Sequence, residues 1–165
     1  MNTLRETFLN ELADVYDAEK QLTRALPKMA KACEDDSLRD GFETHLKETE
    51  NHVKRLDQVF QALGEKAKSK KCKAMQGLIE EGAELIEEEA GDAALICAAQ
   101  KVEHYEIAAY GSLRSWASLL DEPEAAKLLA ATLNEEKATD QKLNEIAETA
   151  INLEEGEEEH AHSRK

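Results

Sequence analysis

Hydrophobic residues recur three or four positions apart along most of the chain, which is the spacing of a helix with one buried face. The pattern predicts four long helices and one shorter helix, over residues 4–32, 38–63, 74–89, 93–120 and from Pro123 onward. No segment shows the strict alternation of polar and apolar residues that a half-buried strand requires. The fold class predicted from this pattern is therefore all-α.

The connections between the helices predict how they are arranged. Short turns join the first two long helices and the last two, whereas the long connection between the second and the third carries the short helix. This order is typical of an up-down-down-up four-helix bundle with one long crossover. We assign residues 1–153 to this bundle, and we expect residues 154–165, an acidic run without large apolar side chains, to form a disordered tail.

Several ionisable residues interrupt the apolar faces of these helices. Glu19 lies on the predicted inner face of the first long helix, and Glu106 lies on that of the third, one turn after Glu103. His45 and His52 lie on the inner face of the second long helix. A buried carboxylate is strongly unfavourable unless a counter-charge or a proton compensates it, so these positions call for a chemical explanation.

The two halves of the chain repeat this arrangement. Glu48 follows Glu19 by 29 residues (48 minus 19), and Glu135 follows Glu106 by the same 29 residues (135 minus 106). Equal spacing in two helix pairs predicts four glutamates at matching depth around a pseudo-twofold axis. Glu48 and Glu135 stand beside the apolar faces rather than on them, so an ordinary glutamate at the edge of the bundle is the alternative for both.

Four facing carboxylates would repel one another and raise each other's pKa. No lysine or arginine occupies the predicted inner faces near them, whereas two divalent cations would balance four negative charges. Hard oxygen ligands suit iron or manganese, so the pattern predicts a dinuclear Fe or Mn centre. The alternative is a set of buried glutamates that are protonated or hydrogen-bonded to tyrosine, for which Tyr16, Tyr105 and Tyr110 are the candidates.

The composition narrows the classes of partner. With 21 basic and 36 acidic residues the chain carries a net charge of −15, which argues against binding to nucleic acid or to an anionic membrane surface. No apolar run approaches the length of a membrane span, and the first twenty residues are too charged for a signal peptide. The three cysteines form no CxxC pair. We therefore expect a soluble protein of the reducing cytoplasm.

Five stretches of the sequence resemble a known family. They are YDAEKQLTRALPK, HLKET, GLIEEGAELIE, DAALICAAQKVEHYEIAAYGSL and NEEKATDQKL, and together they span nearly the whole chain except the acidic tail. On these stretches the chain resembles the YciE/YciF stress proteins of the ferritin-like superfamily. The resemblance implies a ferritin-like four-helix bundle related in shape to rubrerythrin, a role in general or osmotic stress, and association into homodimers.

The resemblance also implies a pattern of metal ligands. Rubrerythrin-like di-iron sites use a glutamate on the first helix, Glu-x-x-His on the second, one or two glutamates on the third and Glu-x-x-His on the fourth. Glu19 matches the first of these positions, and Glu106 matches the third, with Glu103 as the second glutamate. The second helix has no histidine three residues after its glutamate, so either His45 or His52, each within one turn, would complete the site.

The fourth helix departs further from the pattern, because no histidine follows Glu135 or Glu136. A centre rich in carboxylates and poor in histidine favours manganese, peroxide handling or plain metal retention over oxygen activation. The candidate metal ligands are Glu19, His45, Glu48, His52, Glu103, Glu106, Glu135 and Glu136.

We therefore expect a stress-response protein with a dinuclear Fe or Mn centre, and redox chemistry on oxygen or peroxide if it is an enzyme. No rubredoxin-like cysteine quartet is present, so any redox partner would be a separate molecule. The alternative is a metal-poor helical stress protein that acts through its acidic surface or through partner binding. Iron storage ranks last, because nothing in the sequence demands a hollow cage.

Overall fold

The computed structural model describes residues 3–151, and every regular element within that range is a helix. The helices are α1 (Leu4–Ala32), α2 (Asp36–Ala62), α3 (Lys73–Glu87), α4 (Asp92–Leu119) and α5 (Pro123–Ile146), followed by a short π-helical segment, η1 (Ala147–Ile151). The all-α prediction is confirmed, and the predicted helix boundaries lie within two residues of the observed ones. The tail predicted at 154–165 lies outside the described residues.

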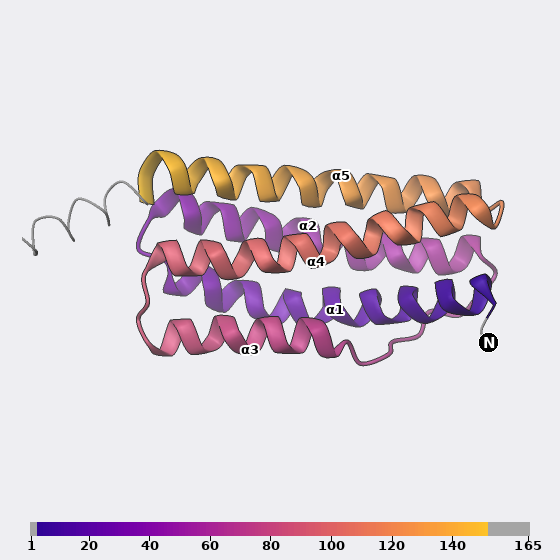
Figure 1. The fold of residues 1–165 in the computed structure, drawn as a ribbon, viewed down its shortest axis with the longest axis horizontal. Helices are drawn as coiled ribbons and strands as arrows, with labels where there is room; N and C mark the ends of the chain where they lie inside the picture. The colour runs from indigo at the N-terminus through magenta and orange to yellow at the C-terminus, as the bar shows by residue number, and fades with distance from the viewer. Residues whose placement is uncertain (1–2, 152–165) are drawn as a thin grey trace, which may run out of the picture.

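The four long helices run lengthwise beside one another (Figure 1). α1 packs against α2 and α4, and α5 packs against α4 and α2, so the four helices enclose a common interior. α1 and α5 run in one direction, and α2 and α4 run in the other, which is the up-down-down-up order (Figure 1). α3 belongs to the crossover between α2 and α4, and it lies along the outside of α1 and α4.

Local signals set where the long helices begin. Thr3 and Glu6 form a capping box at the start of α1, and the Asp35 side chain accepts a hydrogen bond from a backbone N–H in the first turn of α2. Gly91 precedes α4 with a φ of 84°, a conformation that favours glycine. Pro123 opens α5, where its missing N–H leaves no helical hydrogen bond unmade. These starting points determine which side of each helix faces the interior.

The hydrophobic core is divided into two parts. The first core lies toward the end of the bundle that α3 covers, and its buried side chains include Leu22, Leu26, Leu38, Phe42, Met75, Leu95, Ile96, Val102 and Leu143. The second core lies at the other end, and it includes Phe8, Leu12, Tyr16, Leu56, Phe60, Tyr110, Leu113, Leu129 and Leu133. On each long helix, buried ionisable residues that the sequence singled out lie between the two cores.

None of the helices within residues 3–151 combines the length and the apolar character that crossing a bilayer would require.

Candidate metal centre

A layer of buried ionisable side chains separates the first core from the second core. All four long helices contribute to this polar layer, and each of its members is at most 3% exposed. The members are Glu19 from α1, His45 and His52 from α2, Glu103 and Glu106 from α4, and Glu136 from α5. They face one another because each occupies the apolar stripe of its own helix.

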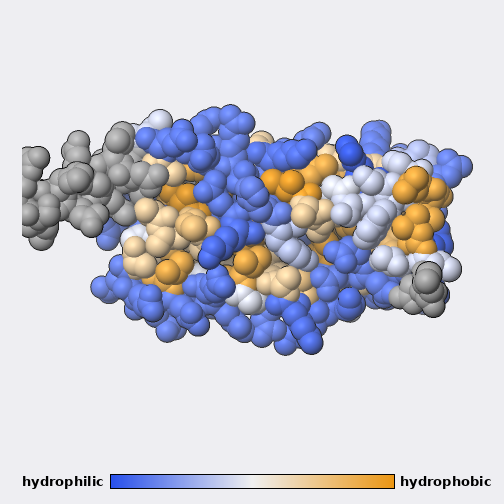
Figure 2. All heavy atoms as spheres, in the orientation of Figure 1, coloured by the Kyte–Doolittle hydropathy of each residue, from blue (hydrophilic) through white to orange (hydrophobic). Residues whose placement is uncertain are grey.

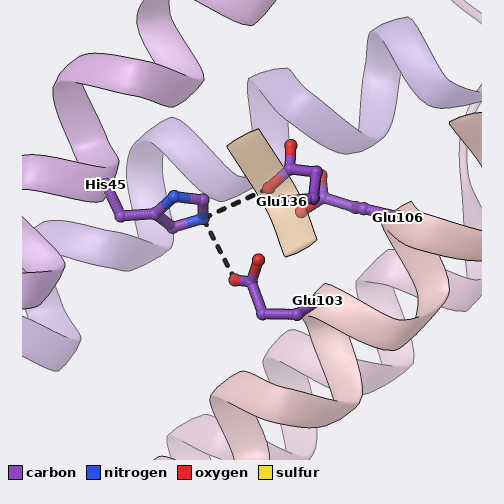
Figure 3. Close-up of side chains that lie close together, drawn as sticks. All are labelled: His45, Glu103, Glu106 and Glu136. Carbon is purple, nitrogen blue, oxygen red and sulfur yellow. Dashed lines mark ion pairs between the residues drawn. The ribbon is translucent and has the colours of Figure 1, made fainter. Parts of the chain in front are cut away.

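One group within the layer gathers around His45 (Figure 3). Its Nε2 atom lies 3.1 Å from Oε1 of Glu103 and 4.0 Å from Oε2 of Glu136. Each of His45, Glu103, Glu106 and Glu136 offers one ligand atom such that all four atoms lie within 4.8 Å of one another. Three carboxylates and one imidazole converging at this separation are a set that a divalent cation of the first transition row can take.

A second group gathers around His52 and includes Glu136 again. The Nδ1 atom of His52 lies 2.9 Å from Oε1 of Glu136 and 3.5 Å from Oε1 of Glu19. Ligand atoms from Glu19, His52 and Glu136 also lie within 4.8 Å of one another. The two groups therefore share one carboxylate, that of Glu136.

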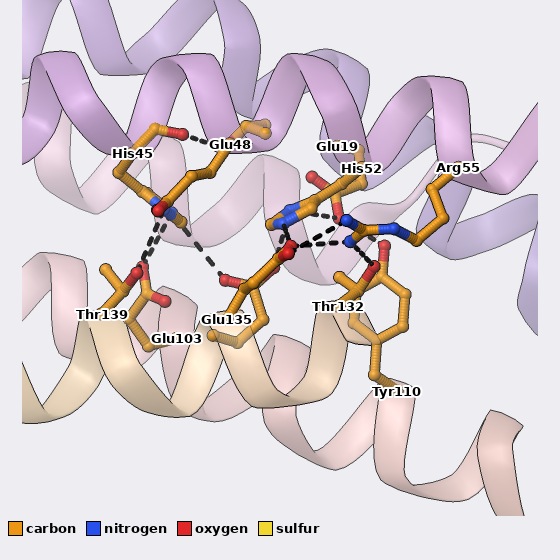
Figure 4. Close-up of polar contacts among 12 residues, drawn as sticks. Glu19, His45, Glu48, His52, Arg55, Glu103, Tyr110, Thr132, Glu135 and Thr139 are labelled. Atoms are coloured by element: carbon orange, nitrogen blue, oxygen red, sulfur yellow. Dashed lines mark hydrogen bonds and ion pairs between the residues drawn. The ribbon is translucent and has the colours of Figure 1, made fainter. Parts of the chain in front are cut away.

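The outer nitrogen of each histidine faces the edge of the bundle (Figure 4). Nε2 of His52 lies 2.8 Å from Oε2 of Glu135, and the Arg55 guanidinium donates to both oxygens of the same carboxylate at 2.6 and 3.0 Å. Nδ1 of His45 has longer contacts, 3.4 Å to the Thr139 hydroxyl and 3.6 Å to Glu48. A carboxylate on the outer nitrogen fixes the ring orientation and leaves the inner nitrogen to face a metal.

A tyrosine completes the inner arrangement. The hydroxyl of Tyr110, which is fully buried, donates a short hydrogen bond to Oε1 of Glu19 (Figure 4). Of the three tyrosines considered from the sequence, Tyr110 is therefore the one that orients a carboxylate of the polar layer. Tyr16 donates to Asp57, and Tyr105 donates to Asp14, both outside the layer.

Many polar atoms of the layer lack an aligned hydrogen-bond partner. These atoms are both oxygens of Glu106 and of Glu136, Oε2 of Glu19 and of Glu103, Nε2 of His45 and Nδ1 of His52. The two histidine nitrogens lie close to carboxylates, at 3.1 and 2.9 Å, but their ring N–H directions do not point at those oxygens. Buried polar atoms are normally satisfied, and a bound cation or added protons would satisfy the atoms that face this space.

Burial and mutual repulsion shift the pKa values in the layer. Burial raises the pKa of Glu19, Glu106 and Glu136, and in Glu106 the neighbouring carboxylates, first Glu136 and then Glu19, raise the pKa further. Burial would lower the pKa of both histidines, but the carboxylates around them outweigh it. The pKa of His45 lies well above its usual value, and that of His52 rises to about 10. The layer thus favours bound positive charge, either protons or metal ions.

The comparisons with known proteins agree with the sequence resemblance. Residues 3–155 match the family described as a domain of unknown function, DUF892. The chain is 52% identical over 157 residues to protein YciF of Escherichia coli (strain K12), which covers 92% of this chain and 95% of YciF. The chain belongs to the DUF892 family.

Solved structures extend the comparison to the fold. The crystal structure of the E. coli stress protein YciF matches with a TM-score of 0.85 and 53% identity over 89% of this chain and 96% of that one. YcfI of Rhodopseudomonas palustris matches with a TM-score of 0.84 and 44% identity over 87% and 94% of the two chains. A protein of Xanthomonas campestris, only 22% identical, shares the fold with a TM-score of 0.73.

Within this DUF892 chain, the structure brings together six of the eight residues proposed from sequence. Glu19 and Glu106 face the interior as expected, and both His45 and His52 do so, although the sequence left open which one. Glu103 lies beside His45 in the same layer. Metal ligation by these residues remains a prediction.

The expected ring of Glu19, Glu48, Glu106 and Glu135 at one depth is wrong. The side chains of Glu48 and Glu135 are 40% and 37% exposed, whereas Glu136 is fully buried. On α5 the buried residues are Ala125, Leu129, Thr132, Leu133, Glu136, Leu143 and Ile146, so the inner face passes through Glu136 and leaves its neighbour at the edge. The equal spacing of 29 residues therefore connects a buried position on α1 with an edge position on α2, and a buried position on α4 with an edge position on α5.

Sequence reasoning missed the arginine at this edge. Arg55 follows His52 by three residues, so the two side chains project on the same side of α2 and meet Glu135 together. The Arg55 guanidinium also donates to the Thr132 hydroxyl at 2.7 Å. A search of the inner faces alone does not find Arg55, because it lies one position before the buried Leu56.

Proposed function

We propose that this protein holds a dinuclear Fe or Mn centre in its polar layer and uses it in a stress response. The proposed ligands are Glu19, His45, His52, Glu103, Glu106 and Glu136. The observation that carries the proposal is the sharing of Glu136 by the two groups. A carboxylate common to both ligand sets would place the two sets side by side, as a dinuclear centre requires.

The donor set fits such a pair. Four carboxylates carry four negative charges, and with two neutral imidazoles they balance two divalent cations, as in the argument from sequence, although Glu103 and Glu136 replace Glu48 and Glu135. The unsatisfied atoms of Glu106 support the proposal as well, since its two oxygens have no hydrogen-bond partner. When bound, such a metal pair supplies Lewis-acid or redox chemistry on oxygen or peroxide.

The surrounding residues would prepare the ligands. Glu135, itself held by Arg55, accepts from the outer nitrogen of His52, and Tyr110 fixes one oxygen of Glu19 and leaves the other free. Because these partners hold the side chains before any ion arrives, little reorganisation would be needed on binding.

Metal analysis tests the proposal directly. Protein purified without oxygen and supplied with iron or manganese should contain about two metal ions per chain. Glu136→Gln removes the shared carboxylate and should lose both ions, whereas Glu145→Gln, an exposed change on the same helix, should keep them. A folded wild-type chain that takes up neither metal would overturn the proposal and favour a metal-poor stress protein acting through its acidic surface.

The name of the E. coli relative as a stress protein supports the proposed stress role. We propose in addition that the protein acts as a homodimer in the cytoplasm, with any electron donor as a separate molecule. Gel filtration at the mass of two chains would support the dimer, and elution as one chain or as a large shell would contradict it.

A further inference from the structure

A partly open cavity of about 190 Å³ lies next to the His45 group of the polar layer. All five helices contribute to its wall, and the wall is mostly apolar. Its apolar side chains include those of Leu22, Leu26, Phe42, Leu78, Val102 and Ile146. In Figure 2 apolar atoms reach the surface amid hydrophilic ones at several places along the bundle, including the end where α3 lies. The cavity thus occupies the first core rather than the second.

The polar residues of the wall differ in burial. His45 and Glu103 are buried, at 3% and 2% exposed, and both belong to the proposed metal centre. Glu48 and Thr139, which lie near Nδ1 of His45, are half-buried. Lys28, Thr44 and Lys142 are exposed at the outer rim. A molecule in the cavity would therefore meet apolar side chains along its length and the His45 group at its inner end.

Small residues leave this space open. The wall includes Gly41, Gly82, Ala98 and Ala99, on helices that otherwise present larger side chains to the first core. A methyl group added at Gly82 would meet only Met29 Sδ at 3.8 Å and the Ala98 methyl at 3.9 Å, which are ordinary contacts. Close packing therefore does not demand glycine at this position, and the helices would accommodate more side-chain volume here.

An apolar cavity of this size selects its ligand by polarity. A dry cavity of about 150 Å³ is large enough to bind benzene, so this one suits a molecule of about six to eight carbon atoms. A charged or strongly polar ligand would lose its hydrogen bonds to water without replacement along the apolar wall. Among the buried side chains of the wall, only those of His45 and Glu103 offer polar partners.

We propose that the cavity is the substrate chamber of the metal centre and takes a small neutral molecule with a hydrocarbon chain and one polar end. This inference rests on the proposed function, because it assigns a substrate class to that same centre. The hydrocarbon chain lies among the apolar side chains of the first core, and the polar end lies against His45 and Glu103.

Binding of 1-hexanol, followed by NMR on the metal-free protein, tests the chamber itself. Hexanol should bind to the wild-type chain, and 1,6-hexanediol should bind more weakly because its second hydroxyl has no partner on the apolar wall. Ala99→Leu fills part of the cavity and should weaken hexanol binding by at least about tenfold. Ala108→Leu, an exposed change on the same helix, should leave it unchanged. If Ala99→Leu fails to fold, Gly82→Ala serves instead, because its added methyl fits without a clash.

Loading the protein with Mn²⁺ then tests whether the cavity borders the proposed metal centre. In protein loaded with Mn²⁺, the proton signals of bound hexanol should broaden, most strongly at the hydroxyl end. If Mn²⁺ binds and hexanol does not, or binds Ala99→Leu equally well, the chamber is overturned and the metal proposal stands. If hexanol binds but the chain takes up no metal, the metal proposal fails, and so does the role of the cavity as its substrate chamber.

Discussion

The two histidines of α2 occupy equivalent places in the polar layer, yet their surroundings differ. The outer nitrogen of His52 lies 2.8 Å from Glu135, which Arg55 holds with two hydrogen bonds. The outer nitrogen of His45 has no contact shorter than 3.4 Å among those within the described residues. The His52 half of the layer is therefore firmly fixed, and the His45 half is held more loosely.

The inner glutamates of the two halves differ in the same way, because the one in the His52 half is also better held by hydrogen bonds. Glu19, in the His52 half, accepts from the Tyr110 hydroxyl, whereas Glu106, in the His45 half, has no hydrogen-bond partner on either oxygen. The His45 half also borders the apolar cavity. We infer that the firm half would fix the position of the metal pair, and that exchange with a ligand would occur on the loose half.

Replacing the two inner glutamates separately should give the largest contrast between the halves. In metal-free protein, Glu106→Leu should raise the free energy of unfolding by about 1 to 4 kcal/mol, because it removes a buried and unpartnered carboxylate. Glu19→Leu should raise the free energy of unfolding much less. It leaves the buried Tyr110 hydroxyl without its hydrogen-bond acceptor, which costs about 1 to 3 kcal/mol. Urea unfolding in the presence of a chelator measures both changes.

Both variants should also lose metal uptake. A variant that is more stable and yet binds no metal would show that these carboxylates serve metal binding rather than stability. Equal stabilisation by the two substitutions would show that Tyr110 does not distinguish the halves. A fall in stability with Glu106→Leu would contradict the picture of repelling carboxylates in the layer.

The stability of the metal-free protein should depend on pH because of the same carboxylate, that of Glu106. The pKa of Glu106 is raised well above its usual 4.5, first by burial and then by the charges of Glu136, Glu19 and Glu103. A group with a raised pKa contributes stability that is complete below its unfolded value and is lost as the pH rises through the folded value. His52, raised to about 10, acts with the same sign at higher pH.

The melting temperature of the metal-free chain should therefore fall between pH 5 and 8, and Glu106→Leu should flatten the slope. Metal-loaded protein should show the reverse slope, because metal binding releases protons from its ligands. Parallel slopes with and without metal would mean that the ion does not bind these carboxylates.

The fold was predictable because its determinants are local. On the second long helix, every residue of the stripe spaced three or four positions apart is buried: Leu38, Phe42, His45, Thr49, His52, Leu56, Val59 and Leu63. Gly91 and Pro123 mark helix starts through backbone geometry alone. Period and caps therefore suffice to place each helix in this chain and, on α2, its inner face as well.

The residues of the site could be predicted only where the inner face of the helix that carries them could be predicted. On α5 two adjacent glutamates, Glu135 and Glu136, compete for one inner place, and a rotation of 100° about the helix axis decides between them. The packing of α5 against α2 and α4 makes that choice, and the sequence of one helix does not contain it. The bond from Arg55 to Glu135 and the cavity beside His45 depend on several helices at once, so they needed the structure.

Removing the arginine of the firm half should have a moderate effect. Arg55→Ala breaks both hydrogen bonds to Glu135 and the one to Thr132. We expect a loss of about 1 to 2 kcal/mol in the free energy of unfolding, at the lower end for charged pairs because Glu135 is 37% exposed and partly screened by water. Lys54→Ala, an exposed change beside it, is the control. A loss no larger than that of the control would mean that the firm half is not held by Arg55.

The matching substitution in the loose half should have the smallest effect. Glu48→Gln removes the charge that lies 3.6 Å from His45, but this carboxylate is 40% exposed and water replaces most of the interaction. His45 is the main cause of the lowered pKa of Glu48, so the two side chains do interact. Exposed ion pairs of this kind nevertheless contribute only about 0 to 1 kcal/mol to stability. We expect a change in unfolding free energy within about 0.5 kcal/mol, measured beside Arg55→Ala under the same conditions. Were Glu48→Gln to cost as much as Arg55→Ala, the two histidines would be held alike and the distinction between the halves would be lost.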